Sequence, residues 1–446
     1  MATILVASYG DHTASKANYD SAYAAASSGD TIQFPLNGSA TWSLGATVGK
    51  AVTIDGNGTT LTSSGSMGTT GFFQITGFTA ISLVRITGFK FSMASADYGV
   101  VVSGMTGGPT VGQIRIDHNT FGAAGAAGGG TQVYFYHGKG LIDHNYFYNG
   151  IKSADISAGT RADADLTWND LSQGSVNCIF FEDNHHIKDT GTTINNFQEN
   201  IGTENGGKLV VRHETFDYSN ITSGLSTVIP VMLHGNAAAG DLPGYWQKNN
   251  GVNGCRRGQP TFEMYENSIL VKNGERFDVL VELRSSSALV YNNTVTGTAA
   301  LEPRIYLWEE EYGSSDWAAN YRTAWPGEDP VDNTFLWNNL YRGVDFNTGA
   351  HGYVEASPAA SAGLMQDRDY WLHAPQSSGG SESFTGAPGG SSSFPTNGST
   401  YSTLGNMIFT ASGPNAYYGY TAYTYPHPLQ GGAANPVRIG FRMNPN

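Results

Sequence analysis

A short unit that recurs along this chain is the feature that most constrains its fold. The unit consists of two or three apolar or β-branched residues, a polar pair, usually an Asn, and a return to apolar residues. Residues 115–121 read Arg-Ile-Asp-His-Asn-Thr-Phe, and residues 141–147 read Leu-Ile-Asp-His-Asn-Tyr-Phe. Further units end at His186, Phe216, Ile269, Val295 and Tyr341. A repeat has to be interpreted before any single motif, because it determines the whole architecture.

The spacing of the units predicts a β-solenoid. Successive markers are 31, 31, 26, 39, 30, 53, 26 and 46 positions apart, and they are Asn57, Gly88, Asn119, Asn145, Asn184, Glu214, Asn267, Asn293 and Asn339. We interpret the interval of 53 as about two coils, and those of 39 and 46 as one coil with a loop. A period in the high twenties without helical segments indicates coils stacked about 4.8 Å apart. The Asn column then predicts a ladder of amide hydrogen bonds along the stack.

The two ends of the chain differ from its repetitive middle. Residues 15–27 have helical spacing and predict a helix that caps the open end of the solenoid, and residues 31–34 restart as a strand. Residues 376–402 are rich in Gly and Ser, whereas the aromatic stretch 417–429 is expected to pack on the solenoid. The predicted organisation is a cap at 1–35, a parallel β-helix at 36–345 and a C-terminal segment at 346–446.

The Ile-Asp-His-Asn units, the helical cap and the Gly-Asp-Thr-Ile segment at residues 29–32 resemble right-handed parallel β-helix proteins of the pectate-lyase-like superfamily. The resemblance covers about residues 15–345 and implies an all-β fold. The superfamily includes bacterial polysaccharide lyases and hydrolases and phage tailspikes, and some members are not enzymes, so the resemblance does not choose a chemistry. The Asp-His pair occurs in two successive coils and is replaced by other residues in the remaining units, so we interpret it as part of the repeat.

Composition narrows the class of partner. The chain has 446 residues, with 37 acidic and 23 basic ones and a net charge of −14, which disfavours nucleic acid because phosphate binding needs a basic surface. No apolar run is long enough to insert into a membrane, and no signal peptide is visible. An extracellular or virion-borne protein is expected. Cys178 and Cys255 could form at most one disulfide, and their spacing suggests neither a metal site nor a redox motif.

One outward column is expected two residues before each marker, at Asp117, Asp143, Glu182, Arg212, Tyr265, Tyr291 and Trp337. A sugar chain suits such a face, because its apolar faces stack on aromatic rings while its hydroxyls meet charged groups. The alternative is an ordinary solvated strand face that carries aromatic residues for their β propensity.

A second column is expected on the preceding strand of each coil. It aligns the segment ending at His137 with those ending at His234, Arg284 and Trp308, and it places His234 near Glu282 or Arg284 and near Trp308 or Glu310. Two long insertions, 236–259 and 309–332, leave the coils at this place. Long aromatic-rich loops in a compact repeat array are usually functional. This is the predicted site.

Three mechanisms fit the residues of the predicted site. A lyase acting on a uronic-acid polymer needs a base, His234, and a cation, which Arg256, Arg257 or Arg284 could supply. A hydrolase needs two carboxylates, for which Glu282 could pair with Asp241 or with one of Glu309, Glu310 and Glu311. The third mechanism is glycan binding without cleavage.

The candidate site residues follow from these columns and loops. The candidate catalytic residues are His234, Arg257, Glu263, Glu282, Arg284 and Glu310. The candidate substrate-binding residues are Arg212, Tyr245, Trp246, Arg256, Trp308, Tyr312, Trp317 and Trp325. No cofactor is expected, although Asp163 and Asp165 could contribute to a Ca²⁺ site. The expected partner is a polysaccharide, and assembly into a homotrimer or filament is left open.

Overall fold

The computed structural model describes part of the chain in detail. The described residues are 1–65, 67, 70–76, 83–93, 98–103, 113–126, 129–136, 139–157, 172–189, 198–204, 206–221, 228–234, 259–274, 277–284, 286–299, 303–307, 331, 333–348, 353–356, 364, 366 and 370–375.

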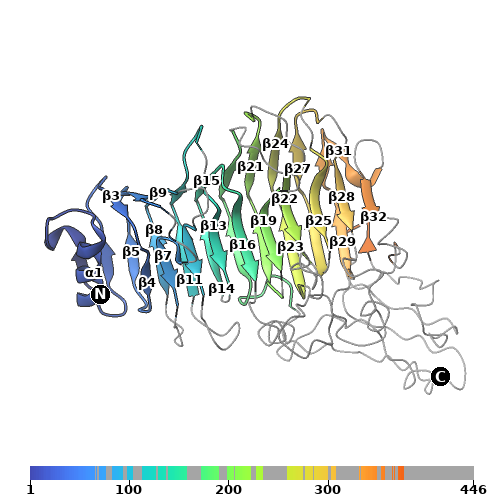
Figure 1. Cartoon of the computed structure of the whole chain (residues 1–446). Coiled ribbons are helices and arrows are strands. Elements are labelled where there is room, and N and C mark those ends of the chain that lie inside the picture. The colour runs from blue at the N-terminus through green and yellow to red at the C-terminus, as the bar shows by residue number, and fades with distance from the viewer. Residues whose placement is uncertain are drawn as a thin grey trace, which may run out of the picture.

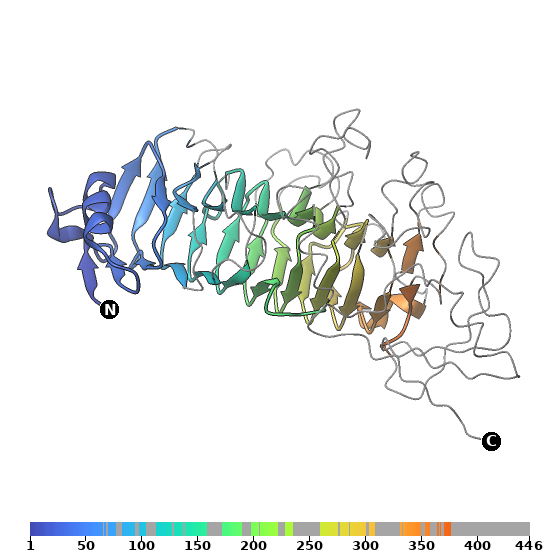
Figure 2. The same cartoon turned by 90° about the horizontal axis from the view of Figure 1, so that it is seen from below.

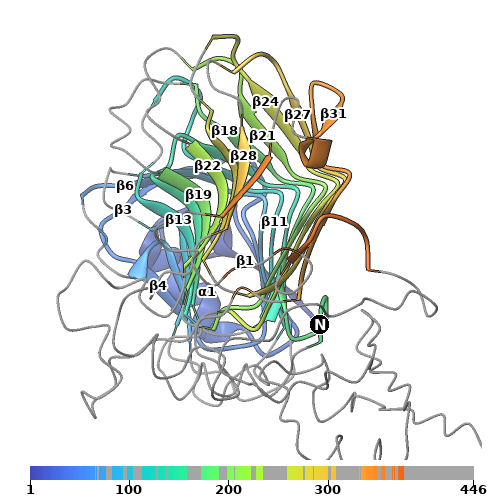
Figure 3. The same cartoon turned by 90° about the vertical axis from the view of Figure 1, so that its right-hand side faces the viewer.

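The described strands form three long sheets that wind around one axis as a right-handed parallel β-helix, so the predicted fold class is confirmed (Figures 1 and 3). The twelve-stranded sheet contains, in spatial order, β1 (Thr3–Leu5), β2 (Thr31–Gln33), β5 (Thr53–Asp55), β8 (Val84–Thr87), β11 (Gln113–Asp117), β14 (Lys139–Asp143), β17 (Ile179–Glu182), β20 (Leu209–Arg212), β23 (Thr261–Tyr265), β26 (Ser287–Tyr291), β29 (Thr334–Trp337) and β33 (Tyr370–Trp371).

The other two sheets repeat the same order along the axis. The eleven-stranded sheet contains β3 (Ser39–Trp42), β6 (Thr60–Ser63), β9 (Lys90–Ser92), β12 (Thr120–Phe121), β15 (Tyr146–Tyr148), β18 (His185–Ile187), β21 (Thr215–Tyr218), β24 (Ser268–Val271), β27 (Thr294–Thr296), β30 (Leu340–Tyr341) and β31 (Val344–Asp345). The ten-stranded sheet contains β4 (Ala46–Val48), β7 (Phe73–Ile75), β10 (Val100–Val102), β13 (Thr131–Phe135), β16 (Lys152–Ser157), β19 (Gln198–Glu204), β22 (Val228–Leu233), β25 (Val279–Leu283), β28 (Arg304–Leu307) and β32 (Tyr353–Ala356).

The N-terminal cap is a helix packed over the first coil, as predicted (Figure 2). After the short 3-10 helix η1 (Val6–Ser8), helix α1 spans Lys16–Ala25, and the Ser15 hydroxyl accepts a hydrogen bond from the Asn18 amide at its start. Tyr19 of α1 packs on Trp42, whose indole nitrogen donates to the Ala14 carbonyl. A second 3-10 helix, η5 (Phe346–Thr348), follows β31. Neither α1 nor any other helix of the described residues is long and apolar enough to cross a membrane.

The predicted Asn ladder is present and buried. The side-chain oxygen of Asn145 accepts from both the backbone amide and the side-chain amide of Asn119, at 2.9 and 3.1 Å. Asn145 in turn donates to Asn184 at 2.9 Å and to the Ile116 carbonyl at 2.8 Å. The pattern resumes from Asn267 through Asn293 to Asn339. Each rung therefore satisfies backbone groups at a bend of the chain that would otherwise be buried without partners.

Two details of the predicted repeat are wrong. In the eleven-stranded sheet, Thr60 pairs with Lys90, and Lys90 pairs with Thr120. The residues directly before these positions, Thr59 and Phe89, are therefore equivalent to Asn119, and the predicted markers Asn57 and Gly88 are not. The ladder begins where the Phe89 amide donates to Asn119. The interval of 53 is also not two coils, because β20 pairs directly with β23. It is one coil that carries a long insertion after β22.

A single left-handed residue precedes each rung. At this turn between the twelve- and eleven-stranded sheets, φ lies between 49° and 58° at His118, His144, Asp183, His213, Glu266, Asn292 and Asn338. An isolated residue in this conformation redirects the strand, and Asn, Asp and His tolerate it better than most other side chains. The turn column therefore has a fixed backbone and outward-pointing side chains.

Aromatic rings stack along the interior beside the Asn ladder. Phe121 and Phe147 stack at 5.0 Å, and the next two positions in the column are His186, at 5.0 Å from Phe147, and Phe216, at 4.6 Å from His186. His186 thus replaces a Phe. In the same region Glu214 replaces an Asn of the ladder. The two exceptions contact each other, with 2.7 Å between His186 Nε2 and a Glu214 carboxyl oxygen.

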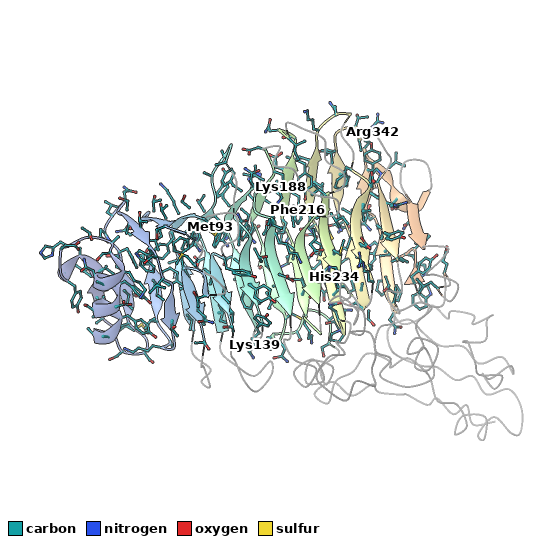
Figure 4. The ribbon with its side chains drawn as sticks, in the orientation of Figure 1. Met93, Lys139, Lys188, Phe216, His234 and Arg342 are labelled. Atoms are coloured by element: carbon teal, nitrogen blue, oxygen red, sulfur yellow. The ribbon has the colours of Figure 1, made fainter. Side chains whose placement is uncertain are left out.

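Burial disfavours the charged forms of both members of the His186–Glu214 pair. It raises the pKa of Glu214 and lowers the pKa of His186, with Lys188 adding to the latter effect. The Glu214 carboxyl group therefore donates its proton to His186 Nε2, although the distance alone would also fit an ion pair. Lys188, labelled near Phe216 in Figure 4, is also buried, which lowers its pKa to about 7.

Restoring both regular ladders tests this pairing. His186→Phe alone leaves the Glu214 carboxyl group without its acceptor, and Glu214→Asn alone leaves His186 Nε2 without its donor. Each single substitution should lower the free energy of unfolding by about 1–3 kcal/mol. His186→Phe/Glu214→Asn should regain that loss, as measured by urea unfolding of all four proteins. Additive losses in the double variant would contradict the pairing.

Candidate functional site

The structure places five of the predicted site residues, and it divides them between two faces. His234, Glu282 and Arg284 lie at the ten-stranded sheet, whereas Arg212 and Glu263 belong to the twelve-stranded sheet. The other candidates lie outside the described residues, and they are Tyr245, Trp246, Arg256, Arg257, Trp308, Glu310, Tyr312, Trp317 and Trp325. Asp163, Asp165 and Cys255 also lie outside, so the Ca²⁺ and disulfide predictions stay predictions. Cys178 is buried.

His234 and Arg284 are neighbours on adjacent coils, in the register that the second column predicts. Leu233 pairs with Leu283, and the Arg284 amide donates to the Leu233 carbonyl at 3.1 Å. Phe135 pairs with Ile156, Ile156 with Thr203, and Thr203 with Leu233. The residue equivalent to His234 is therefore Tyr136 and not His137. His234 directly precedes the long insertion, at the end of β22 (Figure 4).

A buried charged cluster supports His234. Its Nε2 lies 3.0 Å from a carboxylate oxygen of Glu199. The other Glu199 oxygen accepts from the Lys152 ammonium, which also donates to Asp155 at 3.1 Å. Burial alone would raise the pKa of Glu199, but His234 and Lys152 together hold that pKa well below its usual value. Burial opposes the charge of Lys152 as well, yet the two carboxylates raise its pKa. Glu199 and Lys152 are therefore both charged at neutral pH.

Gly202 makes room for this cluster. A Cβ atom at residue 202 would lie 2.8 Å from a Glu199 carboxylate oxygen and 3.2 Å from the Lys152 ammonium. The carboxylate of Glu199 thus occupies the space that a side chain would fill in the outward column of Asp155, Gly202 and Met232. Because residue 202 has no side chain, the Glu199 carboxylate can lie against the sheet, within reach of His234.

Glu282 and Arg284 form a second charged pair on the next coil. Arg284 Nε donates to a Glu282 carboxylate oxygen at 2.7 Å, and both side chains are largely buried. Met232 separates this pair from the Glu199 cluster in the outward column, where it packs with Ile229, Val279 and Tyr306. The face therefore alternates between charged and apolar patches along the axis.

Three tyrosines extend the face towards the N-terminus. Tyr98 and Tyr134 lie 5.6 Å apart with their rings tilted by 55°, and Tyr134 and Tyr136 lie 4.5 Å apart with their rings nearly perpendicular at 77°. Tyr136 is 41% exposed. The exposed surface of Tyr136 is therefore aromatic surface on this face that a ligand could contact.

Arg212 is held by intramolecular contacts. Its guanidinium donates to the Tyr265 hydroxyl and to the Glu182 carboxylate, both at 2.9 Å, and it lies over the Phe180 ring. These contacts make Arg212 a bridge between coils. Glu263 is buried on the same sheet, where burial raises its pKa and Arg212 partly opposes the shift. Residue Gly174, from the segment before β17, lies against its carboxylate.

The first outward column has the predicted register, from Asp117 through Arg212 to Trp337. Its aromatic members stack on one another, however. Tyr265 and Tyr291 are 4.8 Å apart and nearly parallel at 9°, and Tyr291 and Trp337 are 4.3 Å apart at 5°. The ring faces between these residues are therefore occupied, and a sugar cannot stack there. The column joins coils through ring stacking, with its edges exposed.

Sequence reasoning missed Lys152, Asp155 and Glu199. The second column as predicted passes from the segment ending at His137 directly to the segment ending at His234, and it omits the two intervening strands, β16 and β19. Aligning Ala-Asp-Ile at 154–156 and Ile-Gly-Thr at 201–203 with Val-Tyr-Phe at 133–135 would have found Asp155 and Gly202 in the column of Tyr134.

Comparison with known proteins identifies no relative: no family model, curated protein or solved structure matches the chain. Among the described residues, no group of three or more His, Cys, Asp or Glu side chains is arranged to hold a metal ion.

The charge state of Glu199 gives a stability prediction. Its pKa in the folded chain lies below the usual 4.5, so its ion pairs stabilise the fold above pH 4.5 and are lost as the pH falls through the lowered pKa. Glu199→Gln should cost about 1.5–3 kcal/mol of unfolding free energy at neutral pH. The difference from the wild-type chain should shrink in acid.

Urea unfolding across that pH range measures the difference. The control is Asp20→Asn, which removes an exposed ion pair with Lys16 and should change stability by less than about 1 kcal/mol. A Glu199→Gln loss that stays constant into acid would mean that the carboxylate is not ionised in the fold.

Proposed function

We propose that this chain binds a uronic-acid-containing polysaccharide along the outer face of its ten-stranded sheet and cleaves it by elimination. The observation that carries the proposal is the hydrogen bond between the buried carboxylate of Glu199 and the imidazole of His234. A base held by a third group in this way is the arrangement expected of a proton-transfer site. The side chain of His234 is 17% exposed, and its Nδ1 atom is buried.

The ionised carboxylate of Glu199 selects one tautomer of His234. An ionised carboxylate can only accept, so Nε2 of His234 carries a proton, and in the neutral imidazole the lone pair is on Nδ1. In the proposed elimination, the imidazole of His234 turns to bring its buried Nδ1 atom to the substrate, and Nδ1 removes the C5 proton of a uronate residue. The electrons of that C–H bond form the C4–C5 double bond, the bond from C4 to the glycosidic oxygen breaks, and the leaving oxygen takes up a proton. Arg284 on the next coil is the cation proposed to neutralise the uronate carboxylate.

Hydrolysis is less well supported by the charged groups of this face. Glycoside hydrolysis needs a carboxylic acid that keeps its proton near neutral pH. The pKa of Glu199 is lowered, and Glu282 is paired with Arg284. The raised pKa of Glu263 would suit a proton donor, but Glu263 lies on the twelve-stranded sheet.

The tyrosines and the fold support a glycan as the ligand. Tyr98, Tyr134 and Tyr136 lie on the same sheet as His234, and aromatic rings stack on the apolar faces of sugars. The confirmed β-helix agrees with membership of the pectate-lyase-like superfamily, which we propose as its wider group. We also propose that the chain acts outside the cell or on a virion, where such polymers occur.

Incubation of the chain with polygalacturonate, alginate and a neutral glucan tests the proposal. Elimination should produce an unsaturated uronate that absorbs in the near ultraviolet. His234→Asn should reduce kcat at least about 100-fold because it removes the base. His12→Asn, which changes an exposed histidine in the cap, should leave kcat unchanged.

The other outcomes identify the rival functions. New reducing ends without ultraviolet absorbance would indicate a hydrolase and overturn the elimination mechanism. Saturable binding without either product would indicate a non-catalytic glycan-binding or fibre protein, for which the stacked and cross-bonded coils are equally suitable. Turnover that survives His234→Asn would remove His234 from the mechanism.

A further inference from the structure

A short segment before β17 lies across the outer face of the twelve-stranded sheet. Residues 172–178 lead directly into β17, yet the side-chain amide of Gln173 donates to the backbone carbonyl of Ser287, three coils farther along the axis, at 2.7 Å. Because coils stack about 4.8 Å apart, the segment and its side chains span about 14 Å of the axis. We call residues 172–178 the strap.

Two lysines of the coils hold the strap. Lys208, directly before β20, donates to the Ser172 carbonyl at 3.4 Å and to the Ser175 hydroxyl at 3.3 Å. Lys139, the first residue of β14, donates to the side-chain oxygen of Asn177 at 3.4 Å. Hydrogen bonds of these lengths are weak. A surface segment held by such bonds can open without unfolding of the coils beneath it.

The strap contacts the carboxyl group of Glu263. A Cβ atom at residue 174 would lie 2.8 Å from one Glu263 carboxyl oxygen and 3.4 Å from the other, and Gly174 is left-handed with φ of 51°. Glycine is therefore suited to this place, because any other side chain would be strained and would collide with Glu263. Although Glu263 occupies an outward column of β23, between Val210 and Leu289, it is only 9% exposed.

One arginine opposes the effect of burial on Glu263. Burial raises the pKa of Glu263, and the positive charge of Arg212 on the neighbouring coil partly opposes the shift. Arg212 is itself bonded to the Glu182 carboxylate and to the Tyr265 hydroxyl. Other titratable groups in this region are Tyr291 on the following coil, the exposed Glu266 after β23, and Lys208 beside the strap.

We propose that the strap is a conformational switch, which is closed over Glu263 in acid and is released when this carboxyl group loses its proton. In the closed state the strap shields the carboxyl group from water, which disfavours the charged form. In the open state water can reach the carboxylate. Release would uncover Glu263 on the twelve-stranded sheet, a different face from the one that carries His234.

The direction of the switch follows from the raised pKa of Glu263. Its pKa in the closed state lies above the usual 4.5, so closure is fully favoured below pH 4.5 and is progressively lost as the pH rises through the raised value. Each unit by which the strap raises the pKa changes the ratio of open to closed strap by about tenfold.

Hydrogen–deuterium exchange of residues 172–178 tests the switch, with rates expressed as protection factors to remove the intrinsic effect of pH. Protection of the wild-type strap should fall as the pH rises from 4.5 to about 8. In Glu263→Gln, which keeps the shape but cannot ionise, protection should stay constant. The matched control is Glu266→Gln on the same sheet, whose carboxylate is exposed, and it should behave as the wild-type chain does.

A nuclear magnetic resonance titration of isotope-labelled glutamate side chains gives the reciprocal readout. Gly174→Ala should hold the strap open, and Gln173→Ala, which removes the bond to Ser287, should loosen it more mildly. In both variants the pKa of Glu263 should fall towards 4.5. The signal of Glu263 is identified by its loss in Glu263→Gln.

Three outcomes would overturn the proposal. One is a wild-type strap whose protection does not change with pH. Another is a fall in protection that persists in Glu263→Gln, which would assign the effect to a different group. The third is a pKa of Glu263 that neither strap variant lowers, which would mean that the strap does not shield this carboxyl group.

Discussion

The amide ladder from Asn119 to Asn339 constrains everything built on this solenoid. Each rung accepts hydrogen bonds from the coil before it and donates to a carbonyl of that coil, so neighbouring coils can stack in only one register. Equivalent positions then form straight columns with a spacing of about 4.8 Å. Each side chain must therefore be compatible with its own counterpart one coil away. Arginines of one coil bond aspartates of the next, tyrosines stack on a tryptophan, and glycine appears where a neighbouring carboxylate needs the space.

Much of the fold could be predicted from the sequence because a column repeats its residue type. The run of Asn markers predicted the ladder, and the helical pattern of residues 15–27 predicted the cap. The prediction failed where a coil departs from the repeat. Asn57 imitates a rung, but two additional residues shift the turn, and Thr59 occupies the equivalent position. The interval of 53 residues resembles two periods because an insertion happens to have the length of a coil.

The candidate site was harder to predict because the sequence of the ten-stranded sheet does not distinguish residues on its inner side from residues on its outer side. All six residues of β22 are buried, including the outward Ile229 and Met232, so no alternation of apolar and polar residues separates the two faces. For the same reason, the sequence pattern does not indicate that Glu199 and Gly202 contribute to the outer face. The outward aromatic column was predicted in its register but not in its ring orientation, which determines whether a sugar can stack on it. Register follows from spacing, whereas ring orientation follows from side-chain torsions that the sequence does not reveal.

The Glu214–His186 pair distinguishes one coil of this uniform stack from the others. Most rungs are interchangeable, so a growing solenoid that slipped by a whole coil would lose few amide hydrogen bonds. Such a slip would separate Glu214 from His186 and bury two polar groups without partners. Because the two replacements occupy different columns, only the native alignment brings them together. The interruption of two ladders therefore disfavours a solenoid stacked one coil out of place, although it makes the core less regular.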